Sequence, residues 1–140
     1  MPHNINIREA DLNDLPAIDS FDVFAGDRKP GIESGETIVA VLDNVVIGYL
    51  VHNKKFFQRP FIWYLCVRPQ SQRLGAAGLL FNFAEDFYKN EPLLFSSTEA
   101  DNFKMLQFFA KHGYTKSGSI DNLQAQAEVV FVKKLQNAVQ

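Results

Sequence analysis

The feature that most constrains the fold is the stretch VRPQSQRLGAAG, residues 67–78, because it separates two apolar segments. The segment before it, FIWYLC, is short and apolar, which is typical of a buried strand. The segment after it, LLFNFAEDF, carries apolar residues at helical spacing. We therefore expect a strand over 61–67, a tight turn at 72–74 and a helix over 75–89. The expected inward face of this helix consists of Leu79, Leu80, Phe83 and Phe87.

The turn itself has the composition of a phosphate site. Pro69 has no N–H for a β-ladder and marks the end of the strand. Residues 75–78, GAAG, have almost no side chains, so the unpaired N–H groups of the first helical turn are exposed. These groups and the helix dipole attract a phosphate, and Arg73 adds a cation. The nucleoside-triphosphate loop and the dinucleotide fingerprint are both missing. The alternative is an ordinary strand–turn–helix connection.

The first half of the chain predicts a hairpin and an irregular segment. Asp43 and Asn44 tolerate a tight turn and join two β-branched runs, 37–42 and 45–52. Residues 22–35 contain three glycines and a proline, which predicts a loop or a broken short helix. We expect this segment to be more mobile than the core.

The remaining elements complete an α/β chain. Asp11 is expected to cap a helix whose inward residues are Leu12, Leu15 and Ile18. The other expected elements are strands over 5–8, 93–98, 114–120 and 128–135, a link over 54–60, and a helix over 102–112 with Leu106, Phe109 and Ala110 inward and Gly113 as its stop. This order predicts a mixed sheet with helices packed against it, of the α/β (α+β) class.

Composition limits the classes of partner. A length of 140 residues suits one domain over 1–140. A net charge of −2 argues against a nucleic-acid partner. Cys66 is the single cysteine, and the spacing of His3, His52 and His112 matches no metal site, so we expect no metal. Neither a signal peptide nor a membrane-spanning run is evident, so we expect no membrane partner and a cytoplasmic location.

Five residues of the turn carry a resemblance to a known family. Val67, Pro69, Gln72, Gly75 and Ala77 fill the pattern Val-x-Pro-x-x-Gln/Arg-x-x-Gly-x-Gly/Ala. This pattern resembles the signature of the GNAT superfamily of N-acetyltransferases. The resemblance extends over about the whole chain and includes an Asn that opens the next helix and a Gly-aromatic pair that closes it. Asn102 and the HGY sequence at 112–114 correspond to these two features.

The resemblance implies a small acetyl-CoA-dependent transferase. It implies a central mixed sheet of about six to seven strands, splayed after Val67, with the segment 22–35 covering the acceptor site. In that segment Arg28 and Lys29 either touch substrate or are ordinary loop charges. The acceptor would be a small-molecule or peptide primary amine, and a homodimer is compatible with the family. The implied cofactor-binding residues are Leu65, Cys66, Val67, Gln72, Arg73, Leu74, Gly75, Ala76, Ala77, Gly78, Asn102 and Phe109.

The catalytic positions of the family are not filled as the resemblance implies. Its tyrosine acid corresponds to Phe109 and one of its glutamate bases to Ser97, while another carboxylate position falls at Trp63 and Tyr64. A lysine-like amine has a pKa of about 10.4, so only about one molecule in two thousand is neutral at pH 7 and a base matters. Candidate replacements are Tyr64, Glu99 and Tyr114. The alternative function is a coenzyme A-binding sensor or regulatory module that has lost catalysis.

Overall fold

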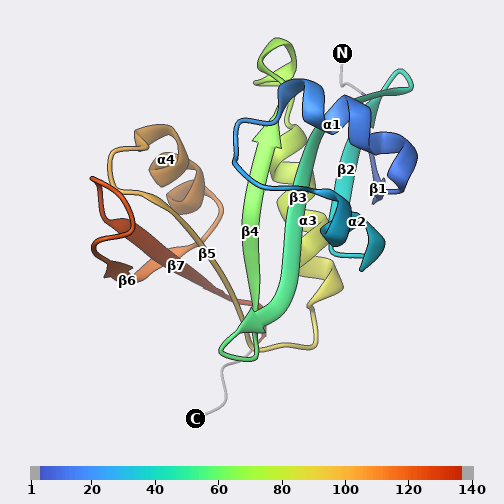
Figure 1. The fold of residues 1–140 in the computed structure, drawn as a ribbon. Coiled ribbons are helices and arrows are strands. Elements are labelled where there is room, and N and C mark those ends of the chain that lie inside the picture. Colours follow the sequence, from blue (N-terminus) through green and yellow to red (C-terminus); the bar gives the residue numbers. More distant parts are fainter. Residues whose placement is uncertain (1–3, 137–140) are drawn as a thin grey trace. The chain divides into compact units, whose positions relative to one another are not determined.

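The computed structural model describes residues 4–136, whose contacts divide into two compact units (Figure 1). The first unit comprises the chain up to Asn53 together with Trp63–Phe87. The second comprises Lys54–Ile62 together with the chain from Tyr88 onward. The expectation of one domain over 1–140 stays a prediction.

Residues 4–136 form seven strands and four helices, of which α2 falls in the segment expected to be a loop or a broken short helix, while the others follow the expected order. The strands are β1 Asn6–Glu9, β2 Thr37–Leu42, β3 Val45–Phe56, β4 Arg59–Val67, β5 Leu93–Glu99, β6 Thr115–Ile120 and β7 Glu128–Lys134. The helices are α1 Leu15–Phe21, α2 Lys29–Glu33, α3 Ala76–Phe87 and α4 Phe103–Lys111, with short 3-10 turns η1 Leu12–Asp14 and η2 Pro69–Ser71.

The strands form one open sheet in the hydrogen-bonded order β1-β2-β3-β4-β5-β7-β6. Strands β4 and β5 are parallel and pair Phe61 with Phe95 and Ile62 with Ser96, whereas β5 and β7 are antiparallel. The sheet is therefore mixed and is flanked by helices, which confirms the predicted fold class. The splay after Val67 stays a prediction.

Two-residue turns connect β2, β3 and β4. Asp43 and Asn44 both have positive φ, 51° and 64°, as a type I′ hairpin requires, so the predicted hairpin is confirmed. The expected link over 54–60 is wrong, because β3 continues to Phe56 and β4 begins at Arg59. Between them Phe57 and Gln58 also have positive φ, 50° and 65°. Neither is a usual turn residue, so the sequence carried no hairpin signal there.

Helix α3 buries a different face from the expected one. In the first unit α1 and α2 lie on one face of β2 and β3, and α3 lies on the other (Figure 1). The buried residues of α3 are Ala76, Leu80, Phe81 and Ala84. Leu79, Phe83 and Phe87 are exposed, so three of the four expected inward residues are wrong. The helix is apolar on two sides, and the period alone did not distinguish them.

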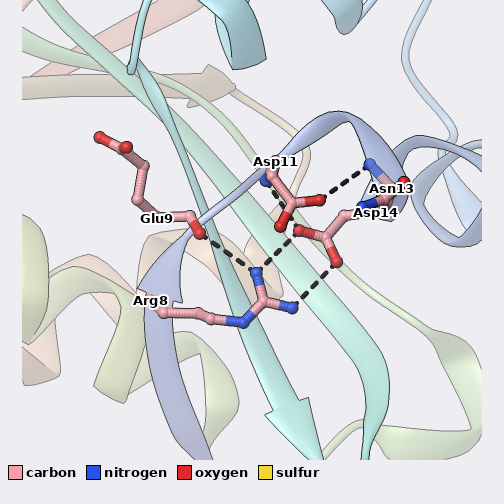
Figure 2. A network of polar contacts seen from close by, with 5 residues as sticks. All are labelled: Arg8, Glu9, Asp11, Asn13 and Asp14. Atoms are coloured by element: carbon pink, nitrogen blue, oxygen red, sulfur yellow. Dashed lines mark hydrogen bonds and ion pairs between the residues drawn. The ribbon is translucent and has the colours of Figure 1, made fainter.

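A polar network caps the 3-10 turn η1, which leads into α1 (Figure 2). Arg8 donates through both terminal nitrogens to the carboxylate of Asp14, at 2.8 and 2.9 Å. Asp14 also accepts from the backbone N of Asp11, whose side chain accepts from Asn13 N, and this reciprocal pair is a capping box. The cap at Asp11 is confirmed. Leu12 is exposed and does not point inward as predicted. The bonds from Arg8 lower the pKa of Asp14.

The second unit is built around aromatic contacts. Phe109 of α4 is fully buried, and its ring stacks on that of Phe131 of β7 at 4.5 Å. Ala110 is exposed, so its predicted inward position is wrong. Gly113 ends the helix with φ of 86°, as expected.

Candidate functional site

The connection from β4 to α3 contains a short 3-10 turn that is held by hydrogen bonds. After β4 the 3-10 turn η2 is held by Arg68, which donates to Ser71 Oγ at 3.1 and 2.8 Å and through its backbone N to Ile47 O at 2.7 Å. The η2 turn was not predicted. Arg73 and Gly75 then take left-handed conformations, with φ of 70° and 91°. Two left-handed residues bring the chain sharply into α3.

Gly75 lies at the start of α3 beside open space. Its carbonyl accepts the bond from Leu79 N at 3.2 Å, so it is the residue before the first helical turn. A Cβ built on Gly75 would meet no atom within 4 Å. Ala77 and Gly78 follow, both half-buried and both small. The N–H groups of a first turn have no acceptor within the helix, so this geometry leaves room for an anion at the turn.

The predicted site residues are divided between the two units. The first unit contains Tyr64, Leu65, Cys66, Val67, Gln72, Arg73, Leu74, Gly75, Ala76, Ala77 and Gly78. The second unit contains Glu99, Asn102, Phe109 and Tyr114. Contact of each of these residues with the cofactor or with substrate stays a prediction.

Cys66 has the environment of a core thiol. It is 7% exposed, and its Sγ donates to Phe21 O at 3.6 Å. Burial raises the pKa of the thiol. A reactive nucleophile needs the opposite shift, toward thiolate. Cys66 therefore acts as a strand residue, as expected from the sequence.

A pocket of about 300 Å³ lies in the first unit. Its walls come from the loop before α2, from α2 itself, from Glu36 just before β2, and from β3 and β4. The lining residues are Ala25, Gly26, Asp27, Arg28, Gly31, Glu36, Val51, Asn53, Trp63 and Tyr64. The segment 22–35 thus lines a pocket, while its mobility stays a prediction. Glu36, just before β2, and Asn53, within β3, were missed because isolated polar residues carry no motif.

The loop before α2 is held by a buried ion pair. Arg28 is 5% exposed, and its Nε lies 3.1 Å from Asp22 Oδ2, an ion pair without hydrogen-bond geometry. Its Nη2 donates to Ala25 O. The other carboxylate oxygen of Asp22 accepts from Tyr49 OH at 2.5 Å and from Phe24 N at 3.1 Å. Burial and this bond raise the pKa of Tyr49, which stays protonated.

Tyr64 is fixed by the same loop. The guanidinium carbon of Arg28 lies 4.2 Å from the Tyr64 ring centroid, and the Phe24 ring lies 5.2 Å away. Within residues 4–136 the Tyr64 hydroxyl makes no hydrogen bond. The Tyr64 ring is thus held by Arg28 and Phe24, while its hydroxyl has no hydrogen-bond partner in that range, and Tyr64 is one of the residues that line the pocket.

A second chain of polar contacts runs along the pocket from β4 through β3 to Glu36, the residue before β2. Trp63 Nε1 donates to Asn53 Oδ1 at 2.7 Å, and Asn53 Nδ2 donates to Glu36 Oε1 at 3.3 Å. Next to Asn53, the buried His52 donates its backbone N–H to Glu36 O at 2.9 Å. Burial lowers the pKa of the His52 ring. The indole of Trp63 is thus held in place while 41% of the residue stays exposed.

The second unit places the other predicted residues on α4, β5 and the start of β6. Asn102 caps α4 by accepting from Met105 N at 3.3 Å. Phe109 packs in the core and has no proton to give. Tyr114 is buried, with Lys133 Nζ 5.5 Å from its ring centroid. Glu99 is exposed at the end of β5.

Ser97 has a carboxylate partner that the sequence did not reveal. Its Oγ donates to Glu128 Oε2 at 2.6 Å across the β5–β7 pair. Gln124 donates to the other oxygen of Glu128 at 3.2 Å. Glu128 therefore brings a carboxylate to the strand position where the resemblance implied a glutamate. Cross-strand pairing, which depends on register, was the missing information.

Two searches concern other kinds of site. In the described range 4–136, no group of three or more His, Cys, Asp or Glu side chains could hold a metal ion. His3 lies outside that range. None of the helices described is long and apolar enough to cross a membrane.

Solved structures of acetyltransferases share this fold. A GNAT-family acetyltransferase from Bacillus cereus matches with a TM-score of 0.81 and 28% identity, over 93% of this chain and 96% of that one. The ribosomal-protein-S18-alanine N-acetyltransferase from Escherichia coli matches with a TM-score of 0.80 and 14% identity, over 97% of each chain. Arabidopsis thaliana Naa50, solved with the bisubstrate analogue CoA-Ac-MVNAL, matches with a TM-score of 0.76 and 19% identity, over 93% and 98%. The mixed sheet is thus the GNAT fold.

Sequence comparison then gives the family. The pattern of the acetyltransferase (GNAT) family matches residues 7–114, and the chain belongs to this family. The comparison with curated protein sequences finds no significant match.

Proposed function

We propose that this chain, as one domain over 1–140, transfers an acetyl group from acetyl-CoA directly to a primary amine. The observation that carries the proposal is the start of α3. There the family signature includes a left-handed Gly75 beside open space, with small residues in the first helical turn. A first turn of this kind binds phosphate through backbone N–H groups. Membership of the acetyltransferase family supports the same reading.

Each part of the turn has a role in this proposal. The N–H groups of 75–78 bind the pyrophosphate, and the exposed Arg73 adds a cation beside it. The backbone of 65–67 pairs with the pantetheine arm. The leaving thiol has a pKa near ~8.5, by analogy with cysteine, and departs as thiolate without a strong acid. Phe109 at the family's acid position is therefore compatible with activity.

The amine still has to lose a proton. Tyr64, Glu99 and Tyr114 are the candidates from the sequence, and the bond between Ser97 and Glu128 adds a fourth. Among these, Glu128 is a carboxylate held by two hydrogen-bond donors, so its position is defined. A general base contributes roughly 10²–10⁴-fold in rate. Glu128→Gln should therefore lower kcat at least tenfold and leave coenzyme A binding unchanged.

A second candidate function is a coenzyme A-binding sensor or regulatory module. It is favoured by one observation, that Phe109 and Ser97 occupy the family's acid and base positions. The sensor would use the same phosphate turn as the acetyltransferase. Only a measurement of acetyl transfer therefore distinguishes the two functions.

An amine-panel acetylation screen with mass readout tests both functions. The panel contains small amines, polyamines, amino acids and peptides with free amino termini, each with acetyl-CoA and purified protein. Acetylation of any member at catalytic rates supports the enzyme. Coenzyme A binding by calorimetry without turnover supports the sensor. If the protein neither acetylates an amine nor binds coenzyme A, both proposed functions are contradicted. We also propose a cytoplasmic protein with no nucleic-acid or membrane partner, compatible with a homodimer.

A further inference from the structure

Two hydrogen-bond donors that line the pocket have no protein partner. Arg28 uses Nε toward Asp22 and Nη2 toward Ala25 O, so its Nη1 is unpartnered within residues 4–136. The hydroxyl of Tyr64 is also unpartnered in that range. Arg28 is 95% buried, since 5% is exposed, and both residues line the same pocket. Neither Nη1 of Arg28 nor the Tyr64 hydroxyl is among the fully buried polar atoms, so both stay accessible to an acceptor atom of a ligand in the pocket that these residues line.

The two donors belong to one rigid assembly. The guanidinium carbon lies 4.2 Å from the Tyr64 ring centroid, so the two groups are in contact. Asp22 holds Arg28, Tyr49 OH holds Asp22, and Phe24 packs on the Tyr64 ring. A site whose groups are fixed before binding loses little side-chain entropy when a ligand arrives.

The chemistry of these two donors, the Arg28 guanidinium and the Tyr64 hydroxyl, limits which ligand atoms they can bind. A guanidinium can only donate, so the atom bound there is a hydrogen-bond acceptor. Asp22 compensates the charge of Arg28, and Asp27 adds a carboxylate to the lining. A neutral carbonyl oxygen therefore suits the site better than a carboxylate, which the nearby aspartates repel.

We propose that Arg28 and Tyr64 form a two-donor seat for a carbonyl oxygen next to the acceptor's amine. The acceptor is then an α-amino amide, either a free amino-acid amide or the first residue of a peptide. A pocket of about 300 Å³ is at the small end for ligand sites and has room for one residue. This inference rests on the proposed function, because it takes the pocket as the acceptor site.

The test compares two probes that differ only in the carboxamide, L-phenylalaninamide and 2-phenylethylamine. Their affinities for the coenzyme A-saturated protein are measured by NMR titration at pH 6, where both amines are protonated. We expect the amide to bind at least about tenfold more tightly. Tyr64→Phe keeps the ring but removes the hydroxyl, and should reduce this ratio to about twofold. The peptide Phe-Ala-Ala amide distinguishes the two sources, because tighter binding than phenylalaninamide indicates a peptide amino terminus.

Tyr88→Phe is the matched control. It removes the hydroxyl of a buried tyrosine in the second unit that does not line the pocket, so the ratio should stay near the wild-type value. Three results would contradict the proposed carbonyl site. The wild type could bind both probes with equal affinity, it could bind neither, or Tyr64→Phe could weaken the binding of both probes equally. Binding is measured here without turnover. If the protein bound the amide selectively but had no transferase activity, the transferase proposal would be wrong, while the proposed carbonyl site would still hold.

Discussion

The turn over 68–78 and the pocket around Arg28 are both in the first unit, but they are built in opposite ways. The turn consists of consecutive residues, and its proposed binding groups are backbone N–H groups next to small side chains. The pocket is assembled from side chains of separate segments, and the bond between Tyr49 and Asp22 alone spans 27 positions. A backbone-built site therefore depends on local conformation, and a side-chain-built site depends on the tertiary fold. Damage to the first should cost binding, and damage to the second should cost stability.

The largest effect is expected where the pocket depends on its buried ion pair. Arg28→Met would leave Asp22 without its cation, and breaking a buried pair in this way costs about 3–5 kcal/mol of unfolding free energy. Urea unfolding measures the change. The double variant Arg28→Met/Asp22→Asn is the control and should recover part of the loss. A loss below ~1 kcal/mol in the single variant would break the contrast between the two regions.

The next largest effect concerns the turn. Gly75→Glu would place a carboxylate in the proposed phosphate space and remove two or three charge-assisted hydrogen bonds of roughly 1.5–3 kcal/mol each. Coenzyme A should bind at least about a hundredfold more weakly in calorimetry.

Two control variants separate charge from backbone strain at this position. Gly75→Ala carries the same left-handed strain without the charge and should lose much less affinity. Gly118→Glu in β6 adds the same charge where a Cβ also meets open space, and should bind normally. A folded Gly75→Glu protein with wild-type affinity would contradict the phosphate turn.

A smaller effect is expected for the side chain beside the turn. Arg73→Ala removes one exposed cation but leaves the backbone N–H groups in place, so affinity should fall only several-fold, since a solvated charge contributes about 1 kcal/mol or less. Calorimetry at two salt concentrations would check it. An effect of Arg73→Ala as large as that of Gly75→Glu would mean that side chains, and not the backbone, bind the pyrophosphate.

The smallest effect comes from the partly exposed pair Arg8–Asp14, the counterpart of the buried pair in the pocket. Arg8 lowers the pKa of Asp14, so the pair stabilises the fold above the ordinary carboxyl pKa and is lost as pH falls through the lowered one. Arg8→Met should cost about 1 kcal/mol at pH 7. In urea unfolding that cost should shrink as the pH falls below the ordinary carboxyl pKa. A cost that does not change with pH would show that the contribution is packing alone.

The sequence predicted most of the fold, because local signals agreed with the tertiary structure. Asp11, Asn102 and Gly113 marked helix ends through capping chemistry, and the Asp43–Asn44 turn marked a hairpin. The inward face of α3 was not predictable, because Leu79 and Phe83 compete with Phe81 and Ala84 and only packing decides between them.

The candidate site followed the same division. The turn at Gly75 could be predicted as a candidate phosphate site from spacing, since the groups proposed to bind phosphate are consecutive in sequence. The pocket could not, because Glu36, Asn53 and Trp63 come together only when β2, β3 and β4 align. Glu128 was missed for the same reason, as the β5–β7 register alone brings it to Ser97.

The interleaving of the two units decides how the chain can be cut. Residues 54–62 belong to the second unit, while the parts of β3 and β4 on either side belong to the first. A fragment that starts at Tyr88 would lack Phe61 and Ile62 and would leave an edge of β5 unpaired and prone to aggregation. No single continuous fragment contains one unit whole without part of the other. A break at Phe57–Gln58 instead gives two halves that each contain parts of both units, so a split reporter made there should regain its fold only when the halves recombine.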